Sequence, residues 1–181
     1  MDLKSREGFS LFEMVVVVGI TVLLSAITLT YNRSSERQLI LFKDQAVVVG
    51  LLNRAKSLAI QKYQNPAITA DYVFCAFGLH LEAPRDVILF ADLGEGSCDP
   101  TNANYRYDAG VVPPEALETK SLDVRNEFSG LPEGGLDILF IAPELTATTS
   151  ADFPVGITIN STVGGLSAAT TISAAGQIIT E

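Results

Sequence analysis

A long apolar run close to the N-terminus constrains this chain more than any other feature. Residues 9–29 contain no Lys, Arg, Asp or Pro, and Glu13 is their single charged residue. As a helix, residues 9–31 would span about 34 Å, which exceeds the roughly 30 Å hydrocarbon core of a bilayer. We therefore expect a membrane-spanning helix to which the rest of the chain is tethered.

The carboxylate of Glu13 is the unusual group in this run. A charged side chain inside a membrane span costs about 2.5–3.5 kcal/mol on insertion scales, so it needs a partner or a proton. One interpretation places Glu13 at the water interface, because it is near the start of the run. That position would tolerate the charge but would not explain the residues that surround it.

Those residues are Gly8-Phe9-Ser10-Leu11-Phe12-Glu13, and a Val-rich stretch follows Met14. The segment resembles the class III signal of type IV prepilins and type II secretion pseudopilins. The resemblance implies that a prepilin peptidase cuts after Gly8 and that the new N-terminal amine of Phe9 is methylated. It also implies that Glu13 pairs with the N-terminal amine of a neighbouring subunit during filament assembly. An ordinary secretory signal differs, because its apolar core is shorter and precedes the cleavage site.

A helical pattern resumes after the polar segment at residues 32–37. Arg54, Lys56, Ser57, Gln61 and Lys62 lie largely off the apolar face. The residues that form that face recur at spacings of three, four and seven, and they are Leu41, Val48, Leu51, Leu52, Ala55, Leu58 and Ala59. We expect one helix over residues 9–63 that ends before Pro66, with the apolar stripe of its second half packed on a sheet.

Beyond residue 72 the pattern changes to that of β-strands separated by Gly- and Pro-rich turns. Alternation predicts that Val73, Cys75, Phe77, Leu79 and Leu81 share one face of the first strand. The expected strands are residues 73–81, 87–91, 117–124, 136–142, 155–160, 169–173 and 177–180. A long helix followed by successive strands predicts an α+β fold with a β-rich antiparallel head.

The resemblance implies a pilin-like arrangement of these parts. It divides the chain into a leader (residues 1–8), a transmembrane half-helix (9–31), a soluble half-helix (32–65) and a globular head (66–181). Residues 51–60 and 172–179 further resemble the end of the helix and the final hairpin of the GspH/FimT-like minor pseudopilins.

Acidic residues are concentrated in the head. From residue 65 to the C-terminus the chain has four basic and sixteen acidic residues, a net charge of −12. Such a surface repels phosphate backbones. Some minor pilins of this group bind DNA through basic residues near the C-terminus, but no Lys or Arg follows Arg125. We therefore expect no nucleic-acid partner.

Cys75 and Cys98 are the two cysteines of the chain. A disulfide between them is permitted if the head lies outside the cytoplasm. Two buried thiols are the alternative, and the disulfide is favoured. The leader is neutral, so the distribution of basic residues does not fix the orientation. The resemblance implies a cytoplasmic N-terminus and an extracytoplasmic head.

Catalytic patterns are weak. His80 is the single histidine, so the chain has no histidine cluster for a metal, and we expect no Ser-His-Asp triad around it. We expect His80 to be a strand residue with a satisfied ring. No glycine-rich phosphate loop joins a strand to a helix. We expect no enzyme, no cofactor and no metal site.

The segment from Asp92 to Asn102 is the one acidic loop with a second interpretation. Its oxygens and glycines are typical of calcium loops, but its spacing does not fit an EF-hand. A solvated surface loop is favoured, and calcium binding stays open.

Two functional hypotheses remain. The first is a minor pilin or pseudopilin, a structural subunit of a type II secretion or type IV pilus filament. Its partners would be other subunits, the prepilin peptidase and methylase, and the inner membrane that it spans once before assembly. The second is a signal-anchored membrane protein whose extracytoplasmic head binds a ligand without entering a filament. Processing at Gly8 separates the two.

Overall fold

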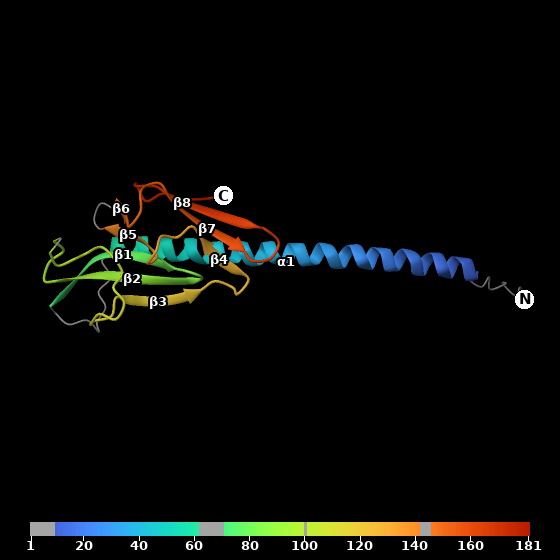
Figure 1. Ribbon diagram of the computed structural model, residues 1–181, viewed down its shortest axis with the longest axis horizontal. Helices are drawn as coiled ribbons and strands as arrows, with labels where there is room; N and C mark the ends of the chain where they lie inside the picture. Colours follow the sequence, from blue (N-terminus) through green and yellow to red (C-terminus); the bar gives the residue numbers. More distant parts are fainter. Residues whose placement is uncertain (1–9, 62–70, 100, 142–145) are drawn as a thin grey trace, which may run out of the picture. The chain divides into compact units, whose positions relative to one another are not determined.

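The computed structural model describes residues 10–61, 71–99, 101–141 and 146–181, which form one α-helix and nine β-strands (Figure 1). The helix α1 covers Leu11–Gln61. The strands are β1 (Tyr72–Glu82), β2 (Asp86–Glu95), β3 (Ala116–Ser121), β4 (Asn126–Ser129), β5 (Leu136–Ile141), β6 (Thr146–Thr149), β7 (Val155–Ser161), β8 (Ser167–Ile172) and β9 (Ile178–Thr180). The expected α+β class with a β-rich head is confirmed.

Contacts divide the chain into two compact units, Met1–Leu39 and Ile40–Glu181. The described part of the first unit is the N-terminal portion of α1. The second unit, called the head below, contains the remainder of α1 and all nine strands. One helix therefore belongs to both units: its N-terminal part lies in the first unit, and its C-terminal part is a component of the head.

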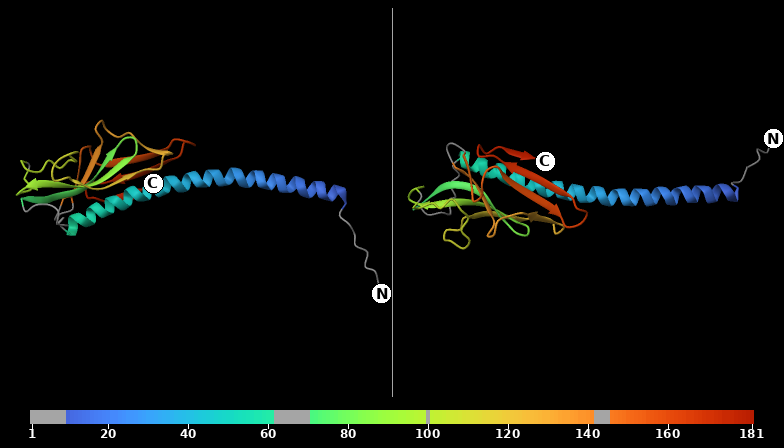
Figure 2. Two further views of the ribbon diagram at one scale, coloured as in Figure 1. Left: turned by 90° about the horizontal axis from the view of Figure 1, so that it is seen from below. Right: turned by 45° about the horizontal axis from the view of Figure 1, so that its top comes forward.

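The C-terminal segment of α1 forms one wall of the core of the head. The apolar stripe predicted from the sequence is buried, and Val48, Leu52 and Ala55 have no exposed surface. Both sheets lie on one side of this segment (Figure 2). They contribute Phe77, Ile138, Ile157 and Ile172, among others, to the same cluster. Removing this apolar area from water is the main force that holds helix and sheets together.

Two buried polar residues fix the position of α1 against the strands. The carboxylate of Asp44 accepts hydrogen bonds from the backbone N–H of Asp123, at 2.8 Å, and from the Asn126 amide, at 2.7 Å. The amide of Gln45 donates to the carbonyl oxygen of Ala169 at 2.7 Å. Buried polar groups need such partners, so the helix has one favourable register on the sheets.

The strands form two antiparallel sheets. The five-stranded sheet has the order β3-β2-β1-β5-β6, and the four-stranded sheet has the order β4-β7-β8-β9. The expected strands over residues 117–124 and 136–142 are β3 and β5, although β3 ends at Ser121. The alternation does not predict β4 and β6, which have four residues each and lie at sheet edges.

An irregularity in β1 corrects the predicted alternation. The register of β1 against β2 shifts between Phe74 and Ala76, as at a β-bulge. Phe74 therefore packs against the main core together with Phe77, and their rings stack with centroids 5.4 Å apart. The prediction that Val73 and Cys75 continue the Phe77 face is wrong at this point, because the bulge reverses the alternation.

The second face of the five-stranded sheet is covered by the chain that joins β2 to β3. Ala76, Ile88, Phe90 and Leu139 form a small buried cluster there, and Tyr105 and Tyr107 of the connection pack on it together with Ile141. The ring of Tyr107 meets Phe90 edge to face, with centroids 5.4 Å apart. This connection carries most of the polar features described below.

Candidate functional site

The N-terminus of α1 carries the residues for which the sequence predicts an assembly role. Ser10 caps the helix, because its Oγ accepts a hydrogen bond from the backbone N–H of Glu13 at 3.2 Å. A Ser followed three residues later by Glu is the pattern of a capping box. Glu13 is exposed in the first turn, where a negative charge is favourable near the positive end of the helix dipole. The predicted cleavage residues Gly8 and Phe9 lie outside the described residues.

The helix that follows is long and apolar enough to cross a membrane. The window Leu11–Thr28 has 18 residues, about 27 Å of helix, and none of them is buried against another part of the chain. Its hydroxyl groups are satisfied within the helix: Ser25 donates to the Thr21 carbonyl at 2.7 Å and Thr28 to the Leu24 carbonyl at 2.8 Å. Internal satisfaction of this kind is what a lipid environment requires. A membrane anchor and a signal sequence both meet these criteria.

The two cysteines form a disulfide that fastens the β2–β3 connection to the sheet. Cys75 of β1 and Cys98 are bridged, with their Cα atoms 5.2 Å apart, as the sequence predicts. Gly94 lies directly beside the bridge, because a Cβ on it would stand 2.8 Å from the Cys75 sulfur and 2.1 Å from the Ser97 carbonyl oxygen. A side chain at residue 94 would therefore push the connection away from β1.

His80 lies in strand β1 and its ring has a hydrogen-bond partner, as expected. Its Nδ1 lies 2.8 Å from Oδ1 of Asp137 on the neighbouring strand β5, and both side chains are buried. The ring of Tyr107 lies against the His80 ring, with centroids 4.9 Å apart. The absence of a side chain at Gly135 leaves room for the His80 ring, because a Cβ there would come within 2.5 Å of the imidazole. The pair joins β1 to β5, and the backbone N–H of Asp137 donates a hydrogen bond to the Ser150 hydroxyl oxygen at 3.0 Å.

An acidic pocket of about 230 Å³ is lined by the C-terminal part of β2 and by the connection between β2 and β3. Asp92, Asp108 and Glu115 line it, together with polar residues that include Thr101, Asn102 and Asn104. Asp92 and Glu115 are 1% and 5% exposed. Oε2 of Glu115 accepts from the backbone N–H of Asp108 at 2.8 Å. Oδ2 of Asp108 accepts from the Asn104 amide at 2.6 Å.

Burial makes the two inner carboxyl groups weak acids. It raises the pKa of Asp92 to about 6, and the nearby charge of Asp108 adds to the shift. It raises the pKa of Glu115 to about 7, with further contributions from the charges of Asp92 and Asp108. Backbone hydrogen bonds oppose both shifts without cancelling them. Near neutral pH the pocket therefore exchanges protons.

These pKa shifts predict that the head is more stable at pH 5 than at pH 8. The comparison applies to the protein without bound metal ions, a condition that a chelator ensures. A carboxyl group with a raised folded-state pKa binds its proton more tightly in the folded than in the unfolded chain. Its contribution is therefore complete below about pH 4 and is lost as the pH rises through 6 to 7. Each group should contribute on the order of 2 kcal/mol. Denaturant unfolding of the full-length protein in detergent with EDTA, at both pH values, measures the difference.

Asp92→Asn should flatten this pH dependence and stabilise the protein at pH 8, because the amide cannot ionise. Asp99→Asn is the matched control. Asp99 is exposed, and hydrogen bonds from Ser97 and Thr101 lower its pKa, so it does not titrate between pH 5 and 8. An equally flat profile for both variants would contradict the assignment to the pocket.

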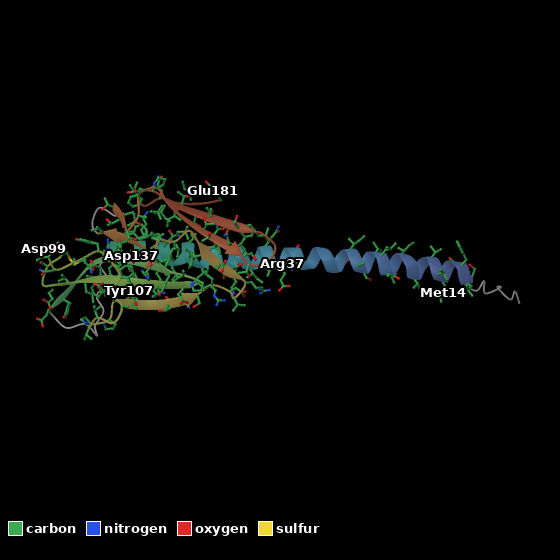
Figure 3. All side chains as sticks on the ribbon, viewed as in Figure 1. Met14, Arg37, Asp99, Tyr107, Asp137 and Glu181 are labelled. Carbon is green, nitrogen blue, oxygen red and sulfur yellow. A yellow bond between two sulfur atoms is a disulfide. The ribbon has the colours of Figure 1, made fainter. Side chains whose placement is uncertain are left out.

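Within the segment from Asp92 to Asn102, Asp92, Thr101 and Asn102 line the pocket, whereas Asp99 does not. Oδ2 of Asp99 accepts from the Ser97 hydroxyl at 2.7 Å, and its Oδ1 accepts from the Thr101 N–H at 3.0 Å. Asp99 thus stabilises its own turn at the outer end of the loop (Figure 3). Asp92 is joined in the pocket by Asp108 and Glu115, which lie outside this segment and which no sequence pattern indicates.

Within the described residues, no three His, Cys, Asp or Glu side chains are grouped so that they could hold a metal ion. The residues of interest thus form two separate groups: the start of α1 around Glu13, and the pocket around Asp92 beside the disulfide. No protein-family model, no curated protein and no solved structure matches this chain.

Proposed function

We propose that this protein is a filament subunit of the pilin or pseudopilin type, stored in a membrane by the N-terminal part of α1 and assembled through that same segment. One observation carries the proposal. The apolar window Leu11–Thr28 is exposed over its whole length and has a single carboxylate, Glu13, in its first turn. Such a surface needs lipid or other helices to cover it.

The continuity of α1 supports assembly better than simple anchoring. A signal anchor needs no helix in common with its head, whereas α1 runs without interruption from Leu11 to Gln61. Its last turns form part of the core of the head, with Leu52 and Ala55 fully buried. The same helix therefore contributes to the core of the head and also carries the apolar surface that is available for packing against other subunits.

The placement of Glu13 supports a role for its charge. Ser10 caps the helix, so the first turn is already stabilised before the Glu13 carboxylate is considered. Once a leader is removed at the Gly8–Phe9 bond, the new amine of a neighbouring subunit would provide the opposite charge. Pairing of the two would offset the cost of placing either one in apolar surroundings.

The disulfide supports an oxidising location for the head. Disulfides persist in secreted and periplasmic proteins and are rare where thiols are kept reduced. The Cys75–Cys98 bridge therefore favours an extracytoplasmic head on a single-pass inner-membrane protein.

Removal of residues 1–8 is the prediction that tests this proposal most cheaply. Mass spectrometry of the mature protein, expressed with a prepilin peptidase, should find an N-methylated Phe9 at the N-terminus. Gly8→Val should block the cut. Gly19→Ala is the matched control, because a Cβ at Gly19 meets nothing within 4 Å. An intact Met1 in assembled material would favour instead a signal-anchored protein whose head binds a ligand.

A further inference from the structure

We propose that the acidic pocket lined by Asp92 and Glu115 is a binding site for a divalent cation of the size of Ca²⁺. The pocket lies entirely within the head, Ile40–Glu181, and uses none of the residues that carry the filament proposal. The two proposals therefore stand or fall separately.

The strongest observation is an unsatisfied oxygen. Oδ2 of Asp92 is the one side-chain oxygen that is buried without a hydrogen-bond partner among the described residues. The residue is 1% exposed and lines the pocket. Buried carboxylate oxygens are normally satisfied, and leaving one without a donor or a cation is costly. A cation in the pocket would satisfy it.

The charge around this oxygen is unbalanced. Three carboxylates line the pocket, and the described lining contains no Lys, Arg or His. Glu115 and Asp108 accept hydrogen bonds from the backbone N–H of Asp108 and the amide of Asn104, but neither donor carries a charge. A bound cation would provide the missing positive charge in a place where salt screens it little.

The ligand chemistry selects the type of ion. The pocket offers carboxylate oxygens from Asp92 and Glu115 and neutral oxygens from Thr101 and Asn102, with no imidazole and no free thiol. Oxygen ligands suit hard cations, whereas Zn²⁺ prefers nitrogen and sulfur. Ca²⁺ accepts six to eight oxygens in a flexible geometry, and Mg²⁺ demands a near-ideal octahedron.

The pocket has room for the ion and for waters that complete its coordination. Its volume of about 230 Å³ is several times the roughly 30 Å³ that one water occupies in the liquid. In the part of the chain that the structure describes, no three His, Cys, Asp or Glu side chains are grouped to hold a metal, so two carboxylates would have to be supplemented by neutral oxygens. We therefore expect the modest affinity of extracellular calcium modules, with a Kd of about 0.1–1 mM.

Binding would add a second cross-link to the β2–β3 connection. The disulfide fastens the connection at Cys98, and the cation would join Asp92 of β2 to Glu115, which precedes β3. Between these two points lie Tyr105 and Tyr107, which cover the sheet. Calcium should therefore order the part of the head that the disulfide leaves unrestrained.

The test uses full-length protein in nonionic detergent at pH 8, stripped with EDTA and then dialysed. We expect 10 mM CaCl₂ to raise the Tm by roughly 3–10 °C, with a shift that grows with the logarithm of the CaCl₂ concentration above the Kd. MgCl₂ at 10 mM should give less than half of that shift, and KCl of equal ionic strength should give none. Calorimetric titration with CaCl₂ should find one site per chain.

Asp92→Asn and Glu115→Gln should each weaken calcium binding at least tenfold while leaving the calcium-free protein folded. Asp99→Asn is the control, because Asp99 lies in the same connection but does not line the pocket. The proposal is overturned if calcium leaves the wild-type Tm unchanged, if both pocket variants keep the full shift, or if only Asp99→Asn loses it. An equal shift with Mg²⁺ would overturn the assignment to an ion of the size of Ca²⁺.

Discussion

Removing the disulfide with the double substitution Cys75→Ser and Cys98→Ser is expected to destabilise the head by roughly 3 kcal/mol. The two cysteines are 23 residues apart, and closing a loop of that length reduces the conformational entropy of the unfolded chain by about this amount. For a protein of this size the Tm should fall by roughly 6–12 °C. Thermal unfolding of the full-length protein in detergent, followed by circular dichroism, measures the change.

Two controls separate the bridge from local packing. Cys75 is 6% exposed, so a buried serine hydroxyl could destabilise the protein without any loss of a covalent bond. The double alanine variant lacks that hydroxyl and should lose a similar amount. Dithiothreitol should lower the Tm of the wild type to that of the variants and leave the variants unchanged. If the reduced and oxidised wild-type proteins melt together, the bridge does not stabilise the head.

The helix could be predicted from the sequence because one periodic pattern serves both local and tertiary structure. The stripe that includes Val48, Leu52 and Ala55 recurs at helical spacing, and the same spacing brings it to one face of α1. The two polar residues on that face could not be predicted. Asp44 and Gln45 resemble ordinary surface residues until β4 and β8 supply their partners from more than 75 positions away in the chain.

Most strands could be predicted because apolar residues mark them, including the three-residue β9 with Ile178 and Ile179, whereas β4 and β6 were not predicted. β5 and β7 have the continuous or alternating burial that a sequence pattern reveals. β4 and β6 have four residues each, and Thr146–Thr149 is composed of Thr and Ala. Edge strands of this length are defined by backbone pairing with a neighbour, β7 for β4 and β5 for β6, and that pairing leaves little trace in composition.

The acidic pocket could not be predicted from the sequence, for a different reason. Proximity in the sequence groups Asp92 with Asp99, but Asp99 is satisfied within its own turn. The antiparallel pairing of β2 with β3 returns the chain beside Asp92, so Glu115 and Asp108 become its neighbours. Carboxylates 16 and 23 positions from Asp92 meet only because the connection folds back over the sheet. No local signal marks that return, although Pro113 and Pro114 indicate a turn just before Glu115.

Loss of the charge on Glu13 should have a large effect on filament assembly. In the proposed filament, the carboxylate pairs with the N-terminal amine of a neighbour in apolar surroundings. Removing one partner of a buried charge pair costs about 2–5 kcal/mol. We therefore expect Glu13→Ala to reduce the incorporation of the subunit into filaments by about 30-fold or more. Membrane insertion should remain intact, because the substitution removes a charge from the apolar segment.

Glu13→Gln removes the charge but keeps a residue type that suits a capping box at the start of α1. Glutamine can replace glutamate in a capping box, so the start of α1 beside Ser10 should be preserved. If the charge matters, Glu13→Gln should fail in filaments as Glu13→Ala does. If only helix capping matters, Glu13→Gln should assemble normally. Glu133→Gln, at an exposed position in the head, controls for the loss of a negative charge elsewhere.

The experiment co-expresses each variant with its partner subunits and compares the membrane and sheared-filament fractions by quantitative immunoblotting. The expected pattern is equal membrane signal for all variants and a filament signal lost in both Glu13 variants but retained in Glu133→Gln. Equal filament signal in Glu13→Ala and the wild type would show that Glu13 is not an assembly residue and is simply exposed at the membrane interface. The exposed surface of Leu11–Thr28 would then have to act through apolar packing alone.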